Sequence, residues 1–229
     1  MTVLPRPDAV LFDLDGTLLD TAPDMVAALQ ALLAEESRPA IAYAAGRGWV
    51  SNGVNGMLKV GFGELPEPER LRLSERFLAI YSTSLTAGTR IFSGMEAVLT
   101  ELDTQGIPWG VVTNKAARMT EPILQSFGLR SRCAAVVCGD TLAVRKPRPE
   151  PLQHALGLIP AVATHAWYIG DADRDIMAGR AAGMRTVAAL YGYIPPGQDP
   201  DRWGADHSIA APSGLLDLLD SADRRKLRG

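Results

Sequence analysis

The stretch from Ala9 to Asp20 constrains the fold more than any other part of the chain. Residues 9–12 are apolar and too few for a helix, so they predict a buried strand, and Asp13 and Asp15 follow where that strand ends. Two positions of separation along an extended chain place both carboxylates on one face, and Gly16 permits a turn that brings backbone N–H groups toward an anion. Carboxylates that face an anion need a cation between them. The stretch therefore predicts a carboxylate nucleophile, a second carboxyl group that moves protons, and a divalent metal ion at a strand end.

Two alternatives compete with that interpretation. The letters Asp-x-Asp-Gly also begin an EF-hand calcium loop, but a loop starting at Asp13 would need glycine at position 18, where Leu stands, and a helix before it, where a strand is predicted. The later acidic run from Asp171 to Asp175 fails the same test, because Ile176 stands where glycine is required. The second alternative is an acidic turn that only caps the next helix. The calcium loop is excluded, and the structural turn stays open at this point.

The composition limits the partners of the chain. Its 229 residues include 23 basic and 26 acidic side chains, with a net charge of −3, so the basic footprint of a nucleic-acid-binding protein is absent. No apolar run approaches the roughly 18 residues of a membrane-spanning helix, and residues 1–7 lack the apolar core of a signal peptide. Cys133 and Cys138 flank a predicted strand and are interpreted as buried thiols. We therefore expect a cytoplasmic protein, a monomer or homodimer, that binds neither nucleic acid nor a membrane.

The segment between the first strand and residue 88 shows helical patterns and no strand pattern. Its first helix is predicted to begin after Thr21, with this residue as N-cap, and to run to about Glu36. The composition then changes, because residues 41–63 are rich in glycine. We predict a small helical insertion at 20–87 within a core domain made of residues 1–19 and 88–229.

From residue 90 onward the sequence alternates helices with short apolar strands. Together with the first strand, the strand patterns are residues 107–114, 134–138, 166–169 and 186–190. Short apolar strands separated by helices predict a doubly wound, mainly parallel α/β sheet of Rossmann-like type. Residues 206–210 are a candidate edge strand, and the basic tail at 224–228 is predicted to be solvated.

Polar groups follow three of the later strands, where a site shared with Asp13 would have to form. Thr113 and Asn114 end the second strand and offer a hydroxyl, an amide and backbone N–H groups to a phosphoryl oxygen, although a simple turn before a helix is the alternative. Lys146 follows the third strand, and its point charge suits both a nucleophilic carboxylate and a phosphate, although a solvated lysine is the alternative. Acids from Asp171 onward follow the fourth strand and complete an oxygen site suited to Mg²⁺.

Four stretches together resemble the ordered motifs of the haloacid dehalogenase-like (HAD) hydrolase superfamily. They are Asp13-Leu14-Asp15-Gly16-Thr17, Val112-Thr113-Asn114, Lys146-Pro147-Arg148-Pro149 and Gly170-Asp171 to Asp175. The resemblance covers nearly the whole chain and implies a HAD core. The helical insertion resembles the C1 cap of this superfamily, and the overall arrangement is similar to phosphoglycolate phosphatases.

The resemblance implies a role for the residues of each motif. Asp13 would be the nucleophile that forms an aspartyl-phosphate, and Asp15 would protonate the leaving alkoxide and then activate water. Thr113 would bind the phosphoryl group and Lys146 would stabilise it.

The resemblance also implies the ligands of a magnesium ion and of the phosphate. Mg²⁺ would be bound by Asp13, by the backbone carbonyl of Asp15 and by Asp171, with Asp175 supporting it from outside the ligand set. The residues implied for phosphate binding are Gly16, Thr17, Thr113, Asn114 and Lys146. Asp173 matches no family position and is given no role.

Three further segments resemble one particular group of phosphatases. Residues 109–115, 191–194 and 203–206 resemble N-acetylmuramic acid 6-phosphate phosphatases, and they lie in the predicted core rather than in the insertion that usually selects substrate. The resemblance thus implies a Mg²⁺-dependent phosphatase of small carboxylated phosphate esters, with 2-phosphoglycolate as first candidate and N-acetylmuramic acid 6-phosphate as alternative. A β-phosphoglucomutase-like phosphomutase is a further alternative, since it also has an acid at the position of Asp15. A binding protein without activity is the alternative from another class.

Arg47, Asn52 and Lys59 are candidate substrate contacts in the insertion. The glycines around them leave room and backbone donors, and Arg47 or Lys59 could bind a second anionic group when the insertion closes over the site. The alternative for this segment is a solvated, irregular linker between helices. Both candidate substrates carry a carboxylate besides the phosphate ester, so a cation here cannot choose between them, whereas the volume of the pocket can.

Overall fold

Six parallel strands form the main sheet of the computed structural model, which describes residues 4–226. In sheet order they are β5 (Ala135–Val137), β4 (Trp109–Val112), β1 (Ala9–Phe12), β6 (Ala166–Gly170), β7 (Arg185–Ala189) and β8 (His207–Ile209). The chain continues from β1 to β4 and β5 on one side and to β6, β7 and β8 on the other, so the strand order reverses beside β1. This arrangement confirms the predicted doubly wound parallel fold, and β8 is the edge strand expected near 206–210.

Helices cover both faces of this sheet. They are α5 (Met95–Thr104), α6 (Ala117–Ser126), α7 (Glu150–Leu158), α8 (Asp173–Ala181) and α9 (Gly214–Lys226), with short 3₁₀ turns η2 (Ala163–His165) and η3 (Pro200–Arg202). Successive residues of β1 point to opposite faces: Val10 and Phe12 pack with side chains of α5, α6 and α9, whereas Ala9 and Leu11 pack with those of α7 and α8. Burial on both faces explains why β1 is apolar throughout and carries no alternating pattern.

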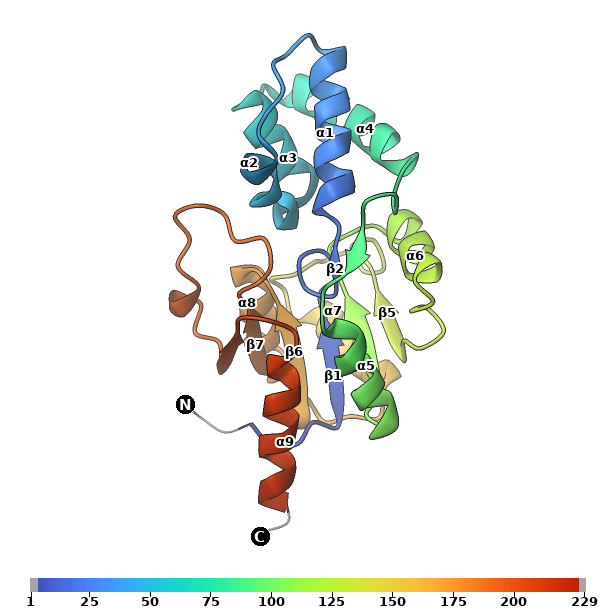
Figure 1. Cartoon of the computed structure of the whole chain (residues 1–229), viewed down its shortest axis with the longest axis vertical. Helices are drawn as coiled ribbons and strands as arrows, with labels where there is room; N and C mark the ends of the chain where they lie inside the picture. Colours follow the sequence, from blue (N-terminus) through green and yellow to red (C-terminus); the bar gives the residue numbers. More distant parts are fainter. Residues whose placement is uncertain (1–3, 227–229) are drawn as a thin grey trace.

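A group of helices, which we call the helical insertion (residues 22–82), lies over the carboxyl ends of the strands (Figure 1). Its elements are α1 (Ala22–Glu35), α2 (Tyr43–Arg47), η1 (Val50–Asn52), α3 (Gly53–Phe62) and α4 (Glu67–Ser82). These helices share an apolar cluster of their own, which includes Leu29, Met57 and Phe77. The glycine-rich segment is therefore ordered as α2, η1 and α3 and is not an irregular linker.

Two connections join the helical insertion to the sheet, and they form a structure that the sequence did not predict. β2 (Leu19–Asp20) pairs antiparallel with β3 (Arg90–Ile91), so Asp20 belongs to a strand where only helix was expected. Thr21 is the N-cap residue of α1, as predicted, but its hydroxyl donates to Asp15 Oδ1 at 2.6 Å and makes no capping hydrogen bond.

Within residues 4–226, none of the helices has the length and apolar character needed to cross a membrane.

Cys133 and Cys138 are both free thiols, as the sequence predicts. Cys138 is buried and Cys133 is partly exposed. The prediction that the basic tail at 224–228 is solvated concerns side chains outside those that the structure describes.

Candidate active site

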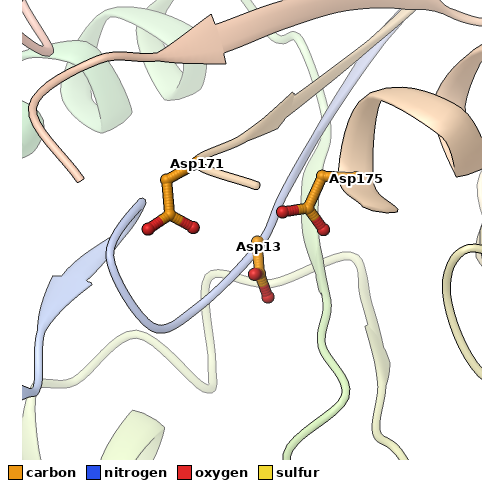
Figure 2. Close-up of side chains that lie close together, drawn as sticks. All are labelled: Asp13, Asp171 and Asp175. Atoms are coloured by element: carbon orange, nitrogen blue, oxygen red, sulfur yellow. The ribbon is translucent and has the colours of Figure 1, made fainter. Parts of the chain in front are cut away.

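Three buried carboxylates converge where β1 and β6 end. Asp13 follows β1, Asp171 follows β6, and Asp175 lies in the first turn of α8 (Figure 2). One side-chain oxygen of each lies within 4.8 Å of the others. This is the edge beside the reversal of strand order, where ligands bind in open α/β sheets.

Gly16 allows the loop after β1 to reach Asp171. Its φ of +84° is unfavourable for other residues, and a Cβ atom there would lie 2.0 Å from Asp171 Oδ2. The glycine is thus required by the close approach of the loop to a carboxylate of the acid cluster. The structure gives Gly16 this packing role, and the predicted role in phosphate binding stays a prediction.

Asp171 offers an oxygen that its protein neighbours leave unpaired. Its Oδ2 accepts hydrogen bonds from the Tyr193 backbone N–H at 2.7 Å and from Ser51 Oγ at 2.6 Å. Its buried Oδ1 has no hydrogen-bond partner among residues 4–226. Burial, and secondly the charge of Asp13, raise the pKa of Asp171 to about 8. A divalent cation would supply what is missing, because hard cations bind carboxylate oxygens and would keep Asp171 ionised.

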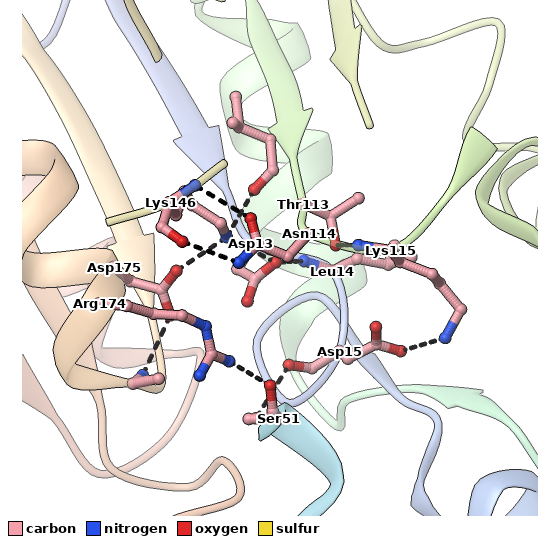
Figure 3. A network of polar contacts seen from close by, with 12 residues as sticks. Asp13, Leu14, Asp15, Ser51, Thr113, Asn114, Lys115, Lys146, Arg174 and Asp175 are labelled. Atoms are coloured by element: carbon pink, nitrogen blue, oxygen red, sulfur yellow. Dashed lines mark hydrogen bonds and ion pairs between the residues drawn. The ribbon is translucent and has the colours of Figure 1, made fainter. Parts of the chain in front are cut away.

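Lys146 supplies positive charge behind the acid cluster. Its Nζ lies 2.9 Å from Asp13 Oδ1 and 2.8 Å from Asp175 Oδ1 (Figure 3). It also contacts the Tyr168 hydroxyl at 2.7 Å. The lysine side chain is 1% exposed, so the predicted alternative of a solvated lysine is wrong. Asp13 Oδ1 also accepts the backbone N–H of Leu14 at 2.7 Å. The contacts of Lys146 and Leu14 are both with Oδ1, so neither of them engages Asp13 Oδ2.

The two oxygens of Asp175 are both engaged by the protein. Oδ1 faces Lys146, and Oδ2 accepts the backbone N–H of Ala172 at 3.1 Å, which fixes the start of α8. A carboxylate used in this way orients its neighbours more than it binds a metal ion. The geometry is therefore compatible with the supporting role predicted for Asp175.

The polar residues after β4 divide into two roles. Thr113 lines the cavity described below, and its hydroxyl oxygen accepts the backbone N–H of Lys115 at 3.2 Å. The side chain of Asn114 instead holds the backbone of Lys146, donating to its carbonyl at 3.0 Å and accepting its N–H at 3.1 Å. One N–H of the Asn114 amide is thus committed to Lys146, but Asn114 also lines the cavity, so its contact with phosphate stays a prediction. Thr17 is fully buried and is not among the residues that line the cavity, so the structure does not support its predicted contact with phosphate.

Asp15 forms an ion pair that the sequence analysis did not predict. Its Oδ1 lies 2.9 Å from Lys115 Nζ and also accepts the Thr21 hydroxyl. Lys115 is 7% exposed and lies over the ring of Tyr81, with Nζ 4.7 Å from the ring centroid. Burial lowers the pKa of Lys115, but Asp15 and Tyr81 together outweigh burial and raise that pKa overall. Lys115 therefore holds the carboxylate of Asp15 beside the cavity.

A cavity of about 540 Å³ lies between the carboxyl ends of the strands and the helical insertion. Asp13 and Asp15 line its core side, together with the loop after β4, the first turn of α6 and Arg174 of α8. Residues of η1, α3 and α4 line the opposite side. The cavity is large enough for a small molecule to reach Asp13.

Two residues of η1 connect the helical insertion to the acid cluster. Ser51 Oγ donates to Asp171, and the Ser51 carbonyl accepts a hydrogen bond from Arg174. The guanidinium of Arg174 also donates to Asn52 Oδ1 at 3.1 Å. Asn52 lines the cavity, as a substrate contact must, but part of its amide is committed to Arg174.

The two cations predicted to bind substrate from the insertion lie elsewhere. Arg47 donates to the carbonyls of Gly192 at 3.1 Å and Tyr191 at 3.3 Å, with its guanidinium over the Tyr193 ring. Lys59 is 56% exposed and pairs with Glu64 at 3.0 Å. Neither residue is among those lining the cavity. Lys59 lies on the exposed side of α3, and Arg47 is hydrogen-bonded to the loop after β7. The structure thus does not support the predicted anion contacts of Arg47 and Lys59.

Sequence reasoning missed Ser51, Lys115 and Arg174. Lys115 directly follows Thr113 and Asn114, and Arg174 lies inside the last acidic run, so position alone could have suggested both. Ser51 had no such signal, because only the fold brings η1 to Asp171.

Comparisons with known proteins agree with this geometry. The family model described as haloacid dehalogenase-like hydrolase matches residues 10–189. A phosphoglycolate phosphatase of Xanthomonas campestris pv. campestris is 46% identical over 209 residues, which are 91% of this chain and 95% of the relative. An N-acetylmuramic acid 6-phosphate phosphatase of Pseudomonas putida is 43% identical over 220 residues, which are 95% and 98% of the two chains.

Solved structures share the fold. The crystal structure of a predicted phosphoglycolate phosphatase from Haemophilus somnus 129PT has a TM-score of 0.82 and 26% identity, covering 95% of this chain and 99% of that one. A hydrolase from Pseudomonas syringae has a TM-score of 0.73 and 28% identity, covering 93% and 98%. The acid cluster at the strand ends, the matched family model and the named relatives together show that the chain belongs to the haloacid dehalogenase-like hydrolase family.

Proposed function

We propose that the chain is a Mg²⁺-dependent phosphomonoester hydrolase that works through an aspartyl-phosphate on Asp13. One observation carries this proposal: Asp13 lines the cavity, whereas Asp171 and Asp175 are fully buried behind it. A carboxylate that substrate can reach, backed by a buried lysine and two further acids, is suited to attack a phosphate ester. The relatives named as phosphatases support the same reaction rather than a phosphomutase.

The chemistry follows from the residues around the cavity. Asp13 Oδ2 bonds to phosphorus while the ester P–O bond breaks, and the leaving oxygen takes a proton from Asp15. Water then attacks the phosphorus and gives its proton to Asp15, and the bond to Asp13 breaks as inorganic phosphate leaves. Thr113 and Lys146 stabilise the phosphoryl group by hydrogen bonding and by charge. That Asp15 lines the same cavity as Asp13 supports its role in both proton transfers.

Mg²⁺ is the cation that this proposal assigns to the acid cluster. Asp13, Asp171 and the backbone carbonyl of Asp15 would hold it, with Asp175 in support. When bound, the ion supplies positive charge that offsets the repulsion between the carboxylates and the phosphate. All of these ligand atoms are oxygens, which suits magnesium.

The substrate we propose is a small phosphate ester that also carries a carboxylate. Relatives named for 2-phosphoglycolate and for N-acetylmuramic acid 6-phosphate both match most of the chain, and both compounds fit this description. We also propose that residues 20–87 act as a cap over a core of 1–19 and 88–229. A cytoplasmic location and a monomeric or homodimeric state stay predictions from the sequence.

Release of inorganic phosphate tests the reaction. We expect the purified chain to hydrolyse p-nitrophenyl phosphate with Mg²⁺ and to lose this activity in excess chelator. Acid quenching during turnover, followed by mass spectrometry of peptides, should find phosphate on the peptide that contains Asp13. Isomerisation of a sugar phosphate without release of phosphate would instead indicate a phosphomutase.

Asp171→Asn should weaken Mg²⁺ binding strongly. The substitution removes a negative charge and leaves only one carbonyl oxygen where two carboxylate oxygens stood. We expect the dissociation constant for Mg²⁺, measured by isothermal titration calorimetry, to rise by about 100-fold or more. Asp173→Asn is the matched control, because Asp173 is exposed and lies two residues away on α8. Equal affinities in the two variants would contradict the assignment of Asp171.

Ser51→Ala tests whether the helical insertion supports the metal site. The serine hydroxyl donates to Asp171 Oδ2 at 2.6 Å, and partners of this kind orient a metal ligand. We expect Mg²⁺ affinity to fall by about 10-fold in calorimetry. Ser82→Ala serves as control, since the hydroxyl of Ser82 only contacts its own helix at Ala79. An unchanged affinity would show that the insertion does not act on the metal site through Ser51.

A further inference from the structure

The cavity is much larger than a phosphate and a two-carbon acid require. Its volume of about 540 Å³ falls within the range of about 300–1,000 Å³ that is typical of pockets for drug-sized ligands. A substrate as small as 2-phosphoglycolate would leave most of this space to water. The volume favours a substrate of the size of a sugar phosphate.

The side of the cavity opposite Asp13 combines apolar and amide groups. Phe77, Leu78 and Tyr81 of α4 line it, and so do Asn52 of η1 and Asn55 of α3. Apolar rings suit the C–H face of a pyranose, and amides suit its hydroxyl or acetamido groups. A two-carbon acid has no group that would use such a wall.

Four cations line the cavity, and three of them are already engaged. Lys115 pairs with Asp15, and Arg174 donates to Ser51 and Asn52 of η1. Arg145 donates from Nε to the carbonyl of Gly139 at 2.6 Å. These side chains hold the loops and the helical insertion in place.

Arg118 differs from these three cations. It lines the cavity from the first turn of α6, it is exposed, and its guanidinium has no hydrogen bond or ion pair with any residue in 4–226. A positive charge in the first turn opposes the helix dipole, so the stability of α6 does not explain it. The backbone N–H of Ala117 is capped by Asp140 instead.

We propose that Arg118 is the specificity-determining residue of this site and binds the carboxylate of a sugar-sized phosphomonoester. The guanidinium is planar and carries parallel N–H groups, so it can bind a carboxylate with two hydrogen bonds. The phosphate of the same molecule lies at Asp13, and its ring lies against the wall formed by α4. This inference rests on the proposed phosphatase activity and names the substrate class of that site: an acidic sugar phosphate, in preference to 2-phosphoglycolate.

The test compares two sugars that differ in one acidic group. N-acetylmuramic acid 6-phosphate and N-acetylglucosamine 6-phosphate share the ring and the phosphate, but only the former carries a carboxylate. Release of phosphate with Mg²⁺ gives kcat/KM for both sugars and for 2-phosphoglycolate. The proteins are the wild type, Arg118→Ala, Arg118→Lys and a control, Arg148→Ala. Arg148 is an exposed arginine that pairs with Glu150 and does not line the cavity.

We expect the wild type to prefer the acidic sugar over the neutral one by about 10- to 100-fold, the effect of a charge-assisted hydrogen bond. Arg118→Ala should remove most of this preference, mainly through KM, and Arg118→Lys should keep part of it. Arg148→Ala should keep all of it. A preference that survives in Arg118→Ala would overturn the role of Arg118, and a wild type faster on 2-phosphoglycolate than on the acidic sugar would overturn the substrate class.

A binding measurement separates this inference from the reaction itself. Calorimetry with N-acetylmuramic acid 6-phosphate is done on Asp13→Asn, which holds the ligand without turnover, and on the same variant with Arg118→Ala added. We expect the dissociation constant to rise by about 10-fold or more in the double variant. Equal constants would overturn the role of Arg118 whatever the activity. A wild type that releases no phosphate even from p-nitrophenyl phosphate would contradict the proposed function, while the binding result would still decide the role of Arg118.

Discussion

Asp13→Asn is expected to abolish phosphate release while the folded protein stays as stable as the wild type or becomes more stable. An amide cannot attack phosphorus, so turnover should fall by about 10⁴-fold or more, to the limit set by the assay. Stability should not follow activity, because burial raises the pKa of Asp13 and makes its charged form unfavourable, only partly offset by Lys146. Replacing the carboxylate with an amide of the same shape removes that unfavourable charge.

Lys146 explains why the substitution is tolerated. It keeps its ion pair with Asp175 at 2.8 Å when the charge of Asp13 is lost, so no buried cation is left without a partner. Phosphate release and thermal unfolding are measured on the same preparation, with Asp173→Asn as the control that should retain activity. Wild-type turnover in Asp13→Asn, after mass spectrometry has excluded deamidation, would falsify the assignment of the nucleophile.

The residues that could be predicted from the sequence share one property. Asp13, Thr113, Lys146 and Asp171 each lie just after an apolar strand or in the segment that follows it. Parallel strands bring their carboxyl ends to one edge of the sheet, so position along the chain predicts position in space. The division into a sheet and a helical insertion follows in the same way from the change of pattern after β1.

Side-chain partners could not be predicted in this way, because they depend on how the insertion lies over the sheet. Arg47 was predicted to contact substrate, but its guanidinium donates hydrogen bonds to the carbonyls of Tyr191 and Gly192. Ser51, an unremarked serine in the sequence, reaches Asp171. Strands of two residues, such as β2, are also too short to leave a pattern.

Asp13→Asn should lose activity but keep its stability, whereas Lys146→Met is expected to lose both activity and stability. Asp13 and Asp175 would remain buried without the cation that lies between them. Breaking a buried ion pair by removing one partner destabilises a protein by about 3–5 kcal/mol, and loss of a charge aimed at the phosphoryl group lowers kcat by about 10²- to 10³-fold. Denaturant unfolding and phosphate release measure the two losses.

Mg²⁺ should distinguish lost charge from lost packing in Lys146→Met. Without the lysine, the acid cluster carries one more uncompensated negative charge, so a divalent cation gains more by binding there and raises the melting temperature more than in the wild type. A cavity left by a shorter side chain would not respond to the ion in this way. Lys59→Met is the control, because Lys59 is exposed and its ion pair with Glu64 should contribute no more than about 1 kcal/mol. Equal shifts with Mg²⁺ in Lys146→Met and the wild type would mean that the buried lysine acts through packing, and the electrostatic account of the site would then be wrong.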